Sequence, residues 1–117
     1  MKNTVPTCTP NPPDAPGSLT EPQLEAYVTI LKALGHPVRL RMVDLIHRQG
    51  GELCVCEFEN HFDLTQPTIS HHLKILRQAG VIRSRQDGSW VRHFIEPGPF
   101  ARIQQLTGVF SGMGELV

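Results

Sequence analysis

The sequence predicts a mainly α-helical domain that carries one β-hairpin. Apolar residues recur at helical spacing in separate segments between residues 24 and 76, and again between residues 100 and 110. After Gly80 two strand-like runs, 81–86 and 89–95, flank Asp-Gly at 87–88, a dipeptide that suits a two-residue hairpin turn. A chain of 117 residues has room for one domain with a modest core.

The first helix is expected to begin after Thr20 and to stop at Gly35. Thr20 can cap this helix, and Gln23 can close a capping box with it. Pro37 suits the first turn of a second helix, which Gly50 and its neighbouring glycine end. The apolar positions that predict the buried faces are Leu24, Tyr27, Val28, Leu31 and Leu34 in the first helix, and Val38, Met42, Leu45 and Ile46 in the second.

A short third helix is expected from about Leu53 to His61, and a fourth between Thr65 and Gly80. Thr65 can cap the fourth helix, whose first turn tolerates Pro67. Its apolar face consists of Ile69, Leu73 and Leu76. A short helix, a turn and a longer helix in this order are the parts of a helix-turn-helix.

The hairpin that follows is rich in arginine. If the dipeptide at 87–88 forms the turn, Arg85 lies opposite Trp90 and Arg83 lies opposite Arg92. The first pair predicts a cation–π contact, and the second is a like-charge pair that would destabilise an isolated hairpin. A nearby phosphate backbone would relieve that repulsion. The alternative is a solvated face on which the long side chains splay apart.

The order of these elements predicts a winged helix-turn-helix in residues 19–117. Pro97, Gly98 and Pro99 separate the hairpin from a last helix with a partial apolar stripe at Phe100, Ile103, Leu106 and Phe110. A core of this size rarely absorbs the stripes of both terminal helices, so we expect them to form a homodimer interface. The alternative is that both pack on the core. Residues 1–18 are expected to be a disordered arm that carries Cys8.

The exposed side of the fourth helix and the hairpin supply the candidate DNA-binding residues. Glutamine, serine and histidine at the start of a recognition helix can bond to base edges, and lysine or arginine can bind phosphate. His72 falls nearer the core and is expected to be packed. The predicted DNA-binding residues are Gln66, Thr68, Ser70, His71, Lys74, Arg83, Arg85 and Arg92. The net charge is zero, but residues 70–93 are basic, so the chain can still bind a polyanion.

Composition excludes several classes of protein. No run approaches the roughly 20 apolar residues that span a bilayer, and prolines interrupt the region of a signal peptide, so we expect a cytoplasmic chain. Three cysteines fit poorly with a disulfide framework, which leaves packing, redox chemistry or metal binding as their roles. We do not expect an enzyme, because no nucleophile–base motif, Gly-rich phosphate loop or acidic dyad is evident.

Three segments match the pattern of one known family. Residues 33–40 read ALGHPVRL, residues 52–57 read ELCVCE and residues 66–74 read QPTISHHLK. In this order they resemble the start of the second helix, the metal-binding box and the recognition helix of the ArsR/SmtB family of metal-responsive repressors. The resemblance runs from about Glu21 to Ile95. It implies a dimeric winged helix that represses transcription and leaves its operator DNA when metal binds.

Cys54 and Cys56, within that box, are the candidate metal ligands. Soft thiolates select soft ions such as As(III), Sb(III), Cd(II) or Pb(II). At positions i and i+2 of a regular helix the two side chains would point about 200° apart. One ion can therefore hold both only if the turn is irregular or unwinds. The alternative is that both cysteines are small buried fillers.

A third ligand is expected from the N-terminal arm. In the family's arsenic-responsive pattern a third cysteine often stands three positions after the second, where this chain has Glu59. The resemblance implies that Cys8 can replace it, because some family members bring arm cysteines to the partner subunit. About eleven residues separate Cys8 from Thr20 and can span up to roughly 36 Å. An idle thiol is the alternative for Cys8. The family's site of histidines and acids on the last helix is not expected, since residues 97–117 hold neither His nor Asp.

The sequence thus predicts a homodimeric repressor that binds operator DNA when metal-free and is released when As(III) or Sb(III) binds Cys8, Cys54 and Cys56. Three thiolates suit pyramidal As(III), whereas a fourth would suit tetrahedral Cd(II) better, so a Cd(II)/Pb(II) sensor is the runner-up. A two-thiolate site would fit a methylated arsenite. A thiol redox switch that binds DNA is an alternative of a different class.

Overall fold

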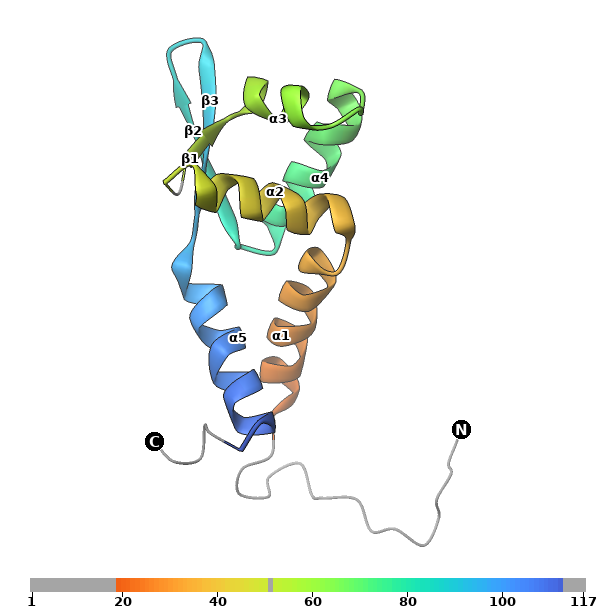
Figure 1. The fold of residues 1–117 in the computed structure, drawn as a ribbon. Helices are drawn as coiled ribbons and strands as arrows, with labels where there is room; N and C mark the ends of the chain where they lie inside the picture. The colour runs from red at the N-terminus through yellow and green to blue at the C-terminus, as the bar shows by residue number, and fades with distance from the viewer. Residues whose placement is uncertain (1–18, 51, 113–117) are drawn as a thin grey trace, which may run out of the picture.

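The computed structural model describes residues 19–50 and 52–112, without the side chains of four residues at 52 and 54–56. The elements are α1 (Glu21–Leu34), α2 (Pro37–Arg48), β1 (Glu52–Cys54), α3 (Val55–His61), α4 (Gln66–Gln78), β2 (Ile82–Asp87), β3 (Trp90–Ile95) and α5 (Pro97–Phe110). Figure 1 shows α2, α3, α4 and the sheet gathered in one body, which we call the winged body. α1 and α5 extend from it, contact one another, and form what we call the terminal helix pair. Within the described ranges no helix is long and apolar enough to cross a membrane.

Capping residues and a first-turn proline mark the starts of three helices, as the sequence predicts. The Thr20 hydroxyl accepts the N–H of Gln23 at 3.3 Å, and the Gln23 side chain accepts the N–H of Thr20 at 2.8 Å, which completes the capping box of α1. Thr65 caps α4 by accepting the N–H of Thr68 at 3.4 Å. Pro37 lies in the first turn of α2. These three predicted helix starts are confirmed.

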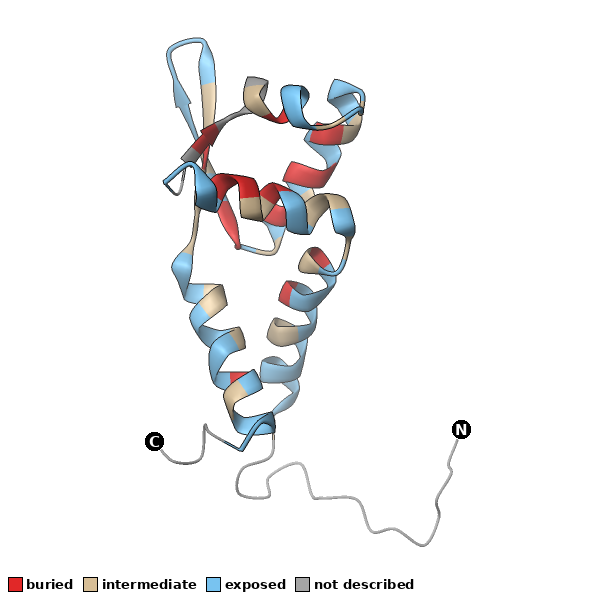
Figure 2. Cartoon of the chain, viewed as in Figure 1, coloured by how far each residue is buried: buried red, intermediate tan, exposed pale blue. Residues whose placement is uncertain are grey.

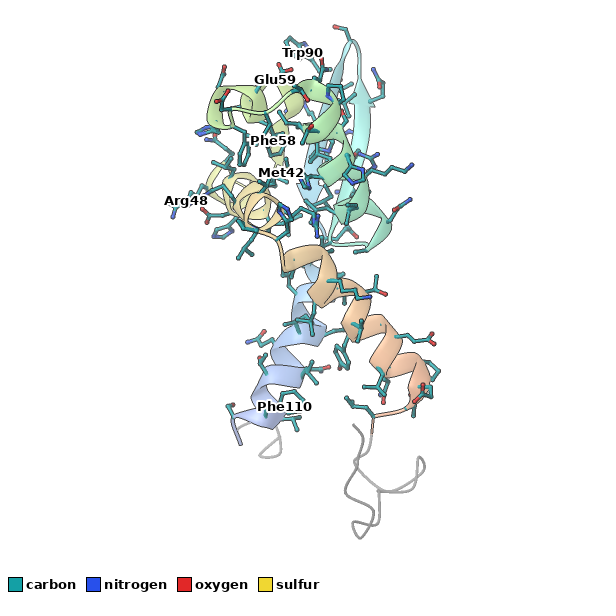
Figure 3. All side chains as sticks on the ribbon, turned by 90° about the vertical axis from the view of Figure 1, so that its right-hand side faces the viewer. Met42, Arg48, Phe58, Glu59, Trp90 and Phe110 are labelled. Atoms are coloured by element: carbon teal, nitrogen blue, oxygen red, sulfur yellow. The ribbon has the colours of Figure 1, made fainter. Side chains whose placement is uncertain are left out.

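Most of the core lies inside the winged body, between α2, α3, α4 and the sheet, and Ile30 and Ala33 of α1 extend it. Met42 and Ile46 of α2 and Phe58 of α3 are completely buried there (Figures 2 and 3). The other buried apolar side chains of this body are Leu45, Leu53, Ile69, Leu73, Leu76, Val81 and Ile82. Each such side chain contributes roughly 1.5–3 kcal/mol through burial, so this core is the main source of stability in one chain.

The predicted start of the third helix at about Leu53 is wrong. Residues 52–54 form β1, which pairs antiparallel with β3, so that Leu53 lies opposite His93 and the strand order is β1-β3-β2. The side chain of Leu53 is buried in the core, and α3 begins only at Val55. A strand of three residues is too short to show a period in the sequence, and its partner strand lies far along the chain.

The hairpin turns one residue later than the sequence predicts. Residues 88–89 form the turn, and Asp87 pairs with Trp90 across it. Gly88 is the first central residue of the turn, with φ +64°, a conformation that glycine adopts without strain. The predicted cross-strand pairs are therefore wrong by two residues, because the turn was centred one residue too early. The side chains that share each face of the hairpin are those that were predicted.

The last helix begins earlier than predicted. Pro97, Gly98 and Pro99 form the first turn of α5 instead of separating it from the hairpin. A proline is tolerated there because the first N–H groups of a helix have no partner within it. As a result α5 follows β3 directly and starts beside the winged body (Figure 1).

Candidate nucleic-acid interface and thiol site

The predicted recognition helix, α4, exposes most of its predicted DNA-binding side chains. Gln66, Ser70, His71 and Lys74 are exposed, while Ile69, Leu73 and Leu76 hold the opposite face in the core. Thr68 is half-buried, and its hydroxyl lies 2.9 Å from that of Thr65. Thr68 is therefore engaged in the N-terminal cap of α4, and the four exposed residues form the surface that can meet a groove of DNA.

The arginines of the hairpin gather around Phe94 rather than Trp90. The guanidinium carbons of Arg83 and Arg85 lie 4.6 and 5.1 Å from the centroid of the Phe94 ring. Arg83 also pairs with Glu96, with 2.7 Å between Nε and Oε1. The predicted contact of Arg85 with Trp90 is wrong because the shifted register removes Trp90 from its partner position.

A like-charge pair is present in the hairpin, but between different residues from those predicted. Arg85, and not Arg83, lies opposite Arg92. The Nε of Arg92 is 3.3 Å from a carboxylate oxygen of Asp87, an acid in the same hairpin. Exposed pairs of this kind are worth at most about 1 kcal/mol. The hairpin arginines can therefore exchange these carboxylates for phosphates at little cost.

Trp90 stands at the free end of the hairpin (Figure 3) and is 54% exposed. Trp90 is not among the DNA-binding candidates predicted from the sequence, which predicts a cation–π pair for it instead. It is the only tryptophan of the chain, so its fluorescence reports on the hairpin end alone.

His93 links the hairpin to α3, the helix that contains Cys56. Its side chain is 2% exposed, and its Nδ1 lies 2.8 Å from the hydroxyl of Ser84 in β2. The centroids of its ring and of the Phe58 ring in α3 are 5.8 Å apart, in an edge-to-face arrangement. Burial lowers the pKa of His93 to about 4, and the charge of Arg77 acts in the same direction. The residue is neutral near pH 7 and was not singled out as a site residue by the sequence, since burial on a half-exposed strand leaves little pattern.

The two candidate ligands of the thiol site stand on either side of a change in secondary structure. Cys54 is the last residue of β1, opposite Arg92 of the hairpin, and Cys56 is the second residue of α3. The two cysteines do not lie on one regular helix. The backbone between them is therefore irregular, as the binding of one ion by both side chains requires. Their side chains and Cys8 lie outside what the structure describes. Among the described side chains no group of three His, Cys, Asp or Glu could hold a metal ion. Glu59 is exposed (Figure 3).

The terminal helix pair leaves apolar side chains uncovered. On α1 the exposed fractions of Leu24, Val28 and Leu31 are 39%, 44% and 45%, and on α5 those of Val109 and Phe110 are 57% and 74%. Figure 2 shows that both helices are mostly exposed, and Figure 3 places Phe110 at the far end of α5. An apolar surface of this kind is typical of an interface with another molecule.

Known proteins show the same pattern from α2 to the first hairpin strand. Residues 36–84 match the family model described as "Bacterial regulatory protein, arsR family". A crystal structure of an ArsR family transcriptional regulator, RHA00566, superposes with a TM-score of 0.70 at 26% identity and covers 79% of this chain and 93% of that chain. The predicted winged fold, mainly α with a β-hairpin, is thereby confirmed.

Two relatives in sequence are regulators from archaea. The uncharacterized HTH-type transcriptional regulator MJ1325 of Methanocaldococcus jannaschii is 41% identical over 61% of this chain and 79% of its own length. A putative arsenical resistance operon repressor of Halobacterium salinarum is 42% identical over 62% of this chain and 56% of its own length. The chain thus spans little more than half of the second relative.

Proposed function

This chain belongs to the arsR family of bacterial regulatory proteins, and from that premise we propose that it is a homodimeric transcriptional repressor released from operator DNA by As(III) or Sb(III). The observation that carries the proposal is the pairing of β1 with β3. It joins the strand that ends at Cys54 directly to the basic hairpin, opposite Arg92. The family consists of DNA-binding regulators, in agreement with the prediction that the chain is not an enzyme.

Two copies of α4, one from each protomer, would read two half-sites of the operator. Exposed Ser70, His71 and Gln66 suit base edges, and Lys74 suits phosphate. The hairpin would bind the neighbouring backbone through its arginines. Two-fold symmetry then requires an inverted repeat with its half-sites about 34–36 Å apart.

Thiolates of Cys54 and Cys56 would hold the inducer, with Cys8 as the third ligand. Trivalent arsenic and antimony supply a soft centre that bonds to several thiolates at once. Because the junction of β1 and α3 lies between Cys54 and Cys56, drawing both sulfurs to one centre changes the backbone at the end of β1. That strand is hydrogen-bonded to β3, so the change reaches the hairpin. The name of the relative from Halobacterium supports an arsenical inducer.

Release requires that the inducer bind the free protein more tightly than the DNA-bound protein. A coupling of about 3 kcal/mol would lower DNA affinity roughly 150-fold. The test is a titration of the reduced protein on operator DNA with As(III), Sb(III), Cd(II), Pb(II) and Zn(II). We expect As(III) and Sb(III) to release DNA at the lowest concentrations. Release by Cd(II) or Pb(II) alone would identify the runner-up, and release by peroxide without metal would identify a redox switch.

Substitution of the cysteines separates sensing from DNA binding. Cys54→Ser and Cys56→Ser should keep the DNA affinity of the metal-free protein and abolish release, because a protonated hydroxyl is a poor ligand for soft ions. Cys8→Ser should weaken As(III) binding if Cys8 is the third ligand. An unchanged response would indicate a two-thiolate site and a methylated arsenite. Loss of metal-free DNA binding in the first two variants would contradict the sensor, since the thiols would then be structural.

The DNA interface has its own test. Arg85→Ala should weaken binding to all sequences alike and reduce the slope of log affinity against log salt by about 1. Ser70→Ala should instead cost roughly 1–3 kcal/mol on the operator and relax its specificity. A normal salt slope in the Arg85 variant would contradict the role of the hairpin.

A further inference from the structure

Arg39 of α2 ties the end of α1 to the recognition helix. Its Nε donates to the carbonyl of Ala33 at 2.7 Å, and its Nη2 donates to the carbonyl of Lys32 at 3.1 Å. Its Nη1 lies 3.3 Å from Nδ1 of His72 in α4. The two carbonyls belong to the last turn of α1, where helix carbonyls lack partners within the helix. One planar guanidinium thus joins three helices, and we call this set of contacts the Arg39 bridge.

The bridge requires a neutral imidazole at His72. A guanidinium can only donate, so Nδ1 of His72 accepts and the proton of the ring lies on Nε2. The side chain is 8% exposed, and burial, together with His36, Arg39 and His71, lowers its pKa. A protonated ring would lose its acceptor and face the cation of Arg39. The hydrogen bond with Arg39 needs a neutral imidazole, and the surroundings of His72 favour the neutral form.

Two further imidazole rings pack around the bridge. The His36 ring lies 4.7 Å from that of His72, and Nδ1 of His36 accepts the N–H of Val38 at the start of α2. The ring of His71, on the exposed side of α4, lies 5.8 Å from the His72 ring. The bridge therefore stands between the start of α2, the end of α1 and the buried side chain of His72 on α4.

We propose that Arg39 and His72 are positioning residues that fix α4 relative to α1 and thereby set the half-site separation that the dimer reads. The inference rests on the proposed function, in which α1 lies at the dimer interface and α4 binds DNA. In a two-fold dimer, the distance and rotation between the two α4 helices follow from the placement of each α4 relative to the interface helices. Apolar packing holds α4 against the core, whereas the directional hydrogen bonds of the bridge fix its orientation toward α1.

The test measures how strictly the dimer selects its spacing. The wild-type protein is first used to select an inverted repeat from random duplex DNA. Its affinity is then compared on duplexes with one base pair added or removed between the half-sites, which rotates one half-site by roughly 35°. We expect the wild-type protein to lose roughly tenfold or more in affinity for each such change. In Arg39→Lys and His72→Phe this preference should shrink to about threefold or less, because the bridge is absent.

Matched variants separate the bridge from general packing. His72→Phe keeps a ring and removes the acceptor, whereas His72→Asn keeps an acceptor near the position of Nδ1, so the Asn variant should restore the wild-type preference. Arg41→Lys, on the exposed side of α2, should change nothing. Sedimentation should show a dimer in every variant, since the apolar face of α1 is intact.

Three outcomes would overturn the inference. The first is a wild-type spacing preference in both Arg39→Lys and His72→Phe. The second is an equal loss of affinity at all spacings with a lower midpoint of unfolding, which would show a purely structural role. The third is a wild-type protein that is monomeric or selects no inverted repeat. That result is recognisable before any variant is made, and it would overturn the proposed function as well.

Discussion

The winged body and the terminal helix pair differ in how completely each is packed within one chain. In the winged body Met42, Ile46 and Phe58 are fully buried, and the sheet closes the core. In the terminal helix pair only Ile30, Ala33 and Leu106 are buried among the described residues, while Val109 and Phe110 are more than half exposed. Ile30 and Ala33 belong to the same core cluster as the winged body. The remaining length of the terminal helix pair has an apolar surface that a second copy would cover.

Geometry explains the difference. A helix pair buries one stripe of each helix in the contact between them, so an apolar stripe wider than that contact stays exposed. The winged body surrounds most of its core with helices and a sheet, and α1 covers a further side with Ile30 and Ala33. A two-fold axis through the terminal helix pair would build a four-helix arrangement from two such pairs. Folding of the winged body and assembly of the dimer are therefore expected to respond to different substitutions.

The largest expected effect is on the core of the winged body. Phe58→Ala should lower the free energy of unfolding by about 3–5 kcal/mol, because it removes a fully buried ring and leaves a cavity. Phe110→Ala is the matched change in the terminal helix pair, where the ring is 74% exposed in one chain. It should weaken the dimer and leave the unfolding of the winged body almost unchanged. Urea unfolding at several protein concentrations checks both, and equal losses would erase the distinction between the regions.

The sequence predicted local features better than features that depend on distant parts of the chain. Helices and caps depend on neighbours within one turn, so Thr20, Pro37 and Thr65 were placed correctly. The strand β1 was missed because its pairing depends on β3, about 40 residues further along the chain. The register of the hairpin was wrong because Gly88 can serve as the first or the second residue of a tight turn.

The candidate site was predictable where it depends on one helix. The exposed face of α4, with Ser70 and Lys74, follows from its helical period. The partners of the arginines, Phe94 and Glu96, depend on cross-strand geometry and could not be derived from the sequence. The contact of Arg39 with His72 joins residues 33 positions apart and was equally invisible, although the packing of His72 was predicted.

Acid should weaken the winged body before the terminal helix pair. The pKa of His93 is about 4 in the folded chain and 6.5 when unfolded, so above pH 6.5 the ring is neutral in both states and its titration does not affect stability. As the pH falls toward 4 the fold loses about 3 kcal/mol, because the unfolded chain takes up the proton first. α1 and α5 contain no histidine. His93→Gln should be less stable at pH 7 but should lose less on acidification, and urea unfolding at pH 7 and 4.5 measures both. An equal acid loss in both proteins would contradict this role of His93.

A smaller effect is expected at the dimer interface itself. Leu31→Ala should weaken dimerisation by about 2 kcal/mol, roughly 30-fold, because the same apolar contact is lost on both protomers. Leu40→Ala, on the winged body, is the control, since Leu40 is 55% exposed on α2. Sedimentation over a range of concentrations gives both dissociation constants. A dimer that responds to Leu40→Ala and ignores Leu31→Ala would move the interface to the winged body.

The smallest expected effect comes from one substitution made in each region. Thr20→Ala and Thr65→Ala each remove a hydroxyl that caps a helix, α1 in the first case and α4 in the second, at a cost of about 1 kcal/mol. Because α4 forms part of the core, Thr65→Ala should speed amide exchange throughout the winged body. Because α1 packs against α5 in the terminal helix pair, Thr20→Ala should speed amide exchange in both helices and weaken the dimer. Amides of the core should keep their protection. Exchange measured residue by residue distinguishes the two patterns. If Thr20→Ala instead loosens the core as much as Thr65→Ala does, then α1 folds as one cooperative unit with the winged body, and the two regions differ in exposure but not in stability.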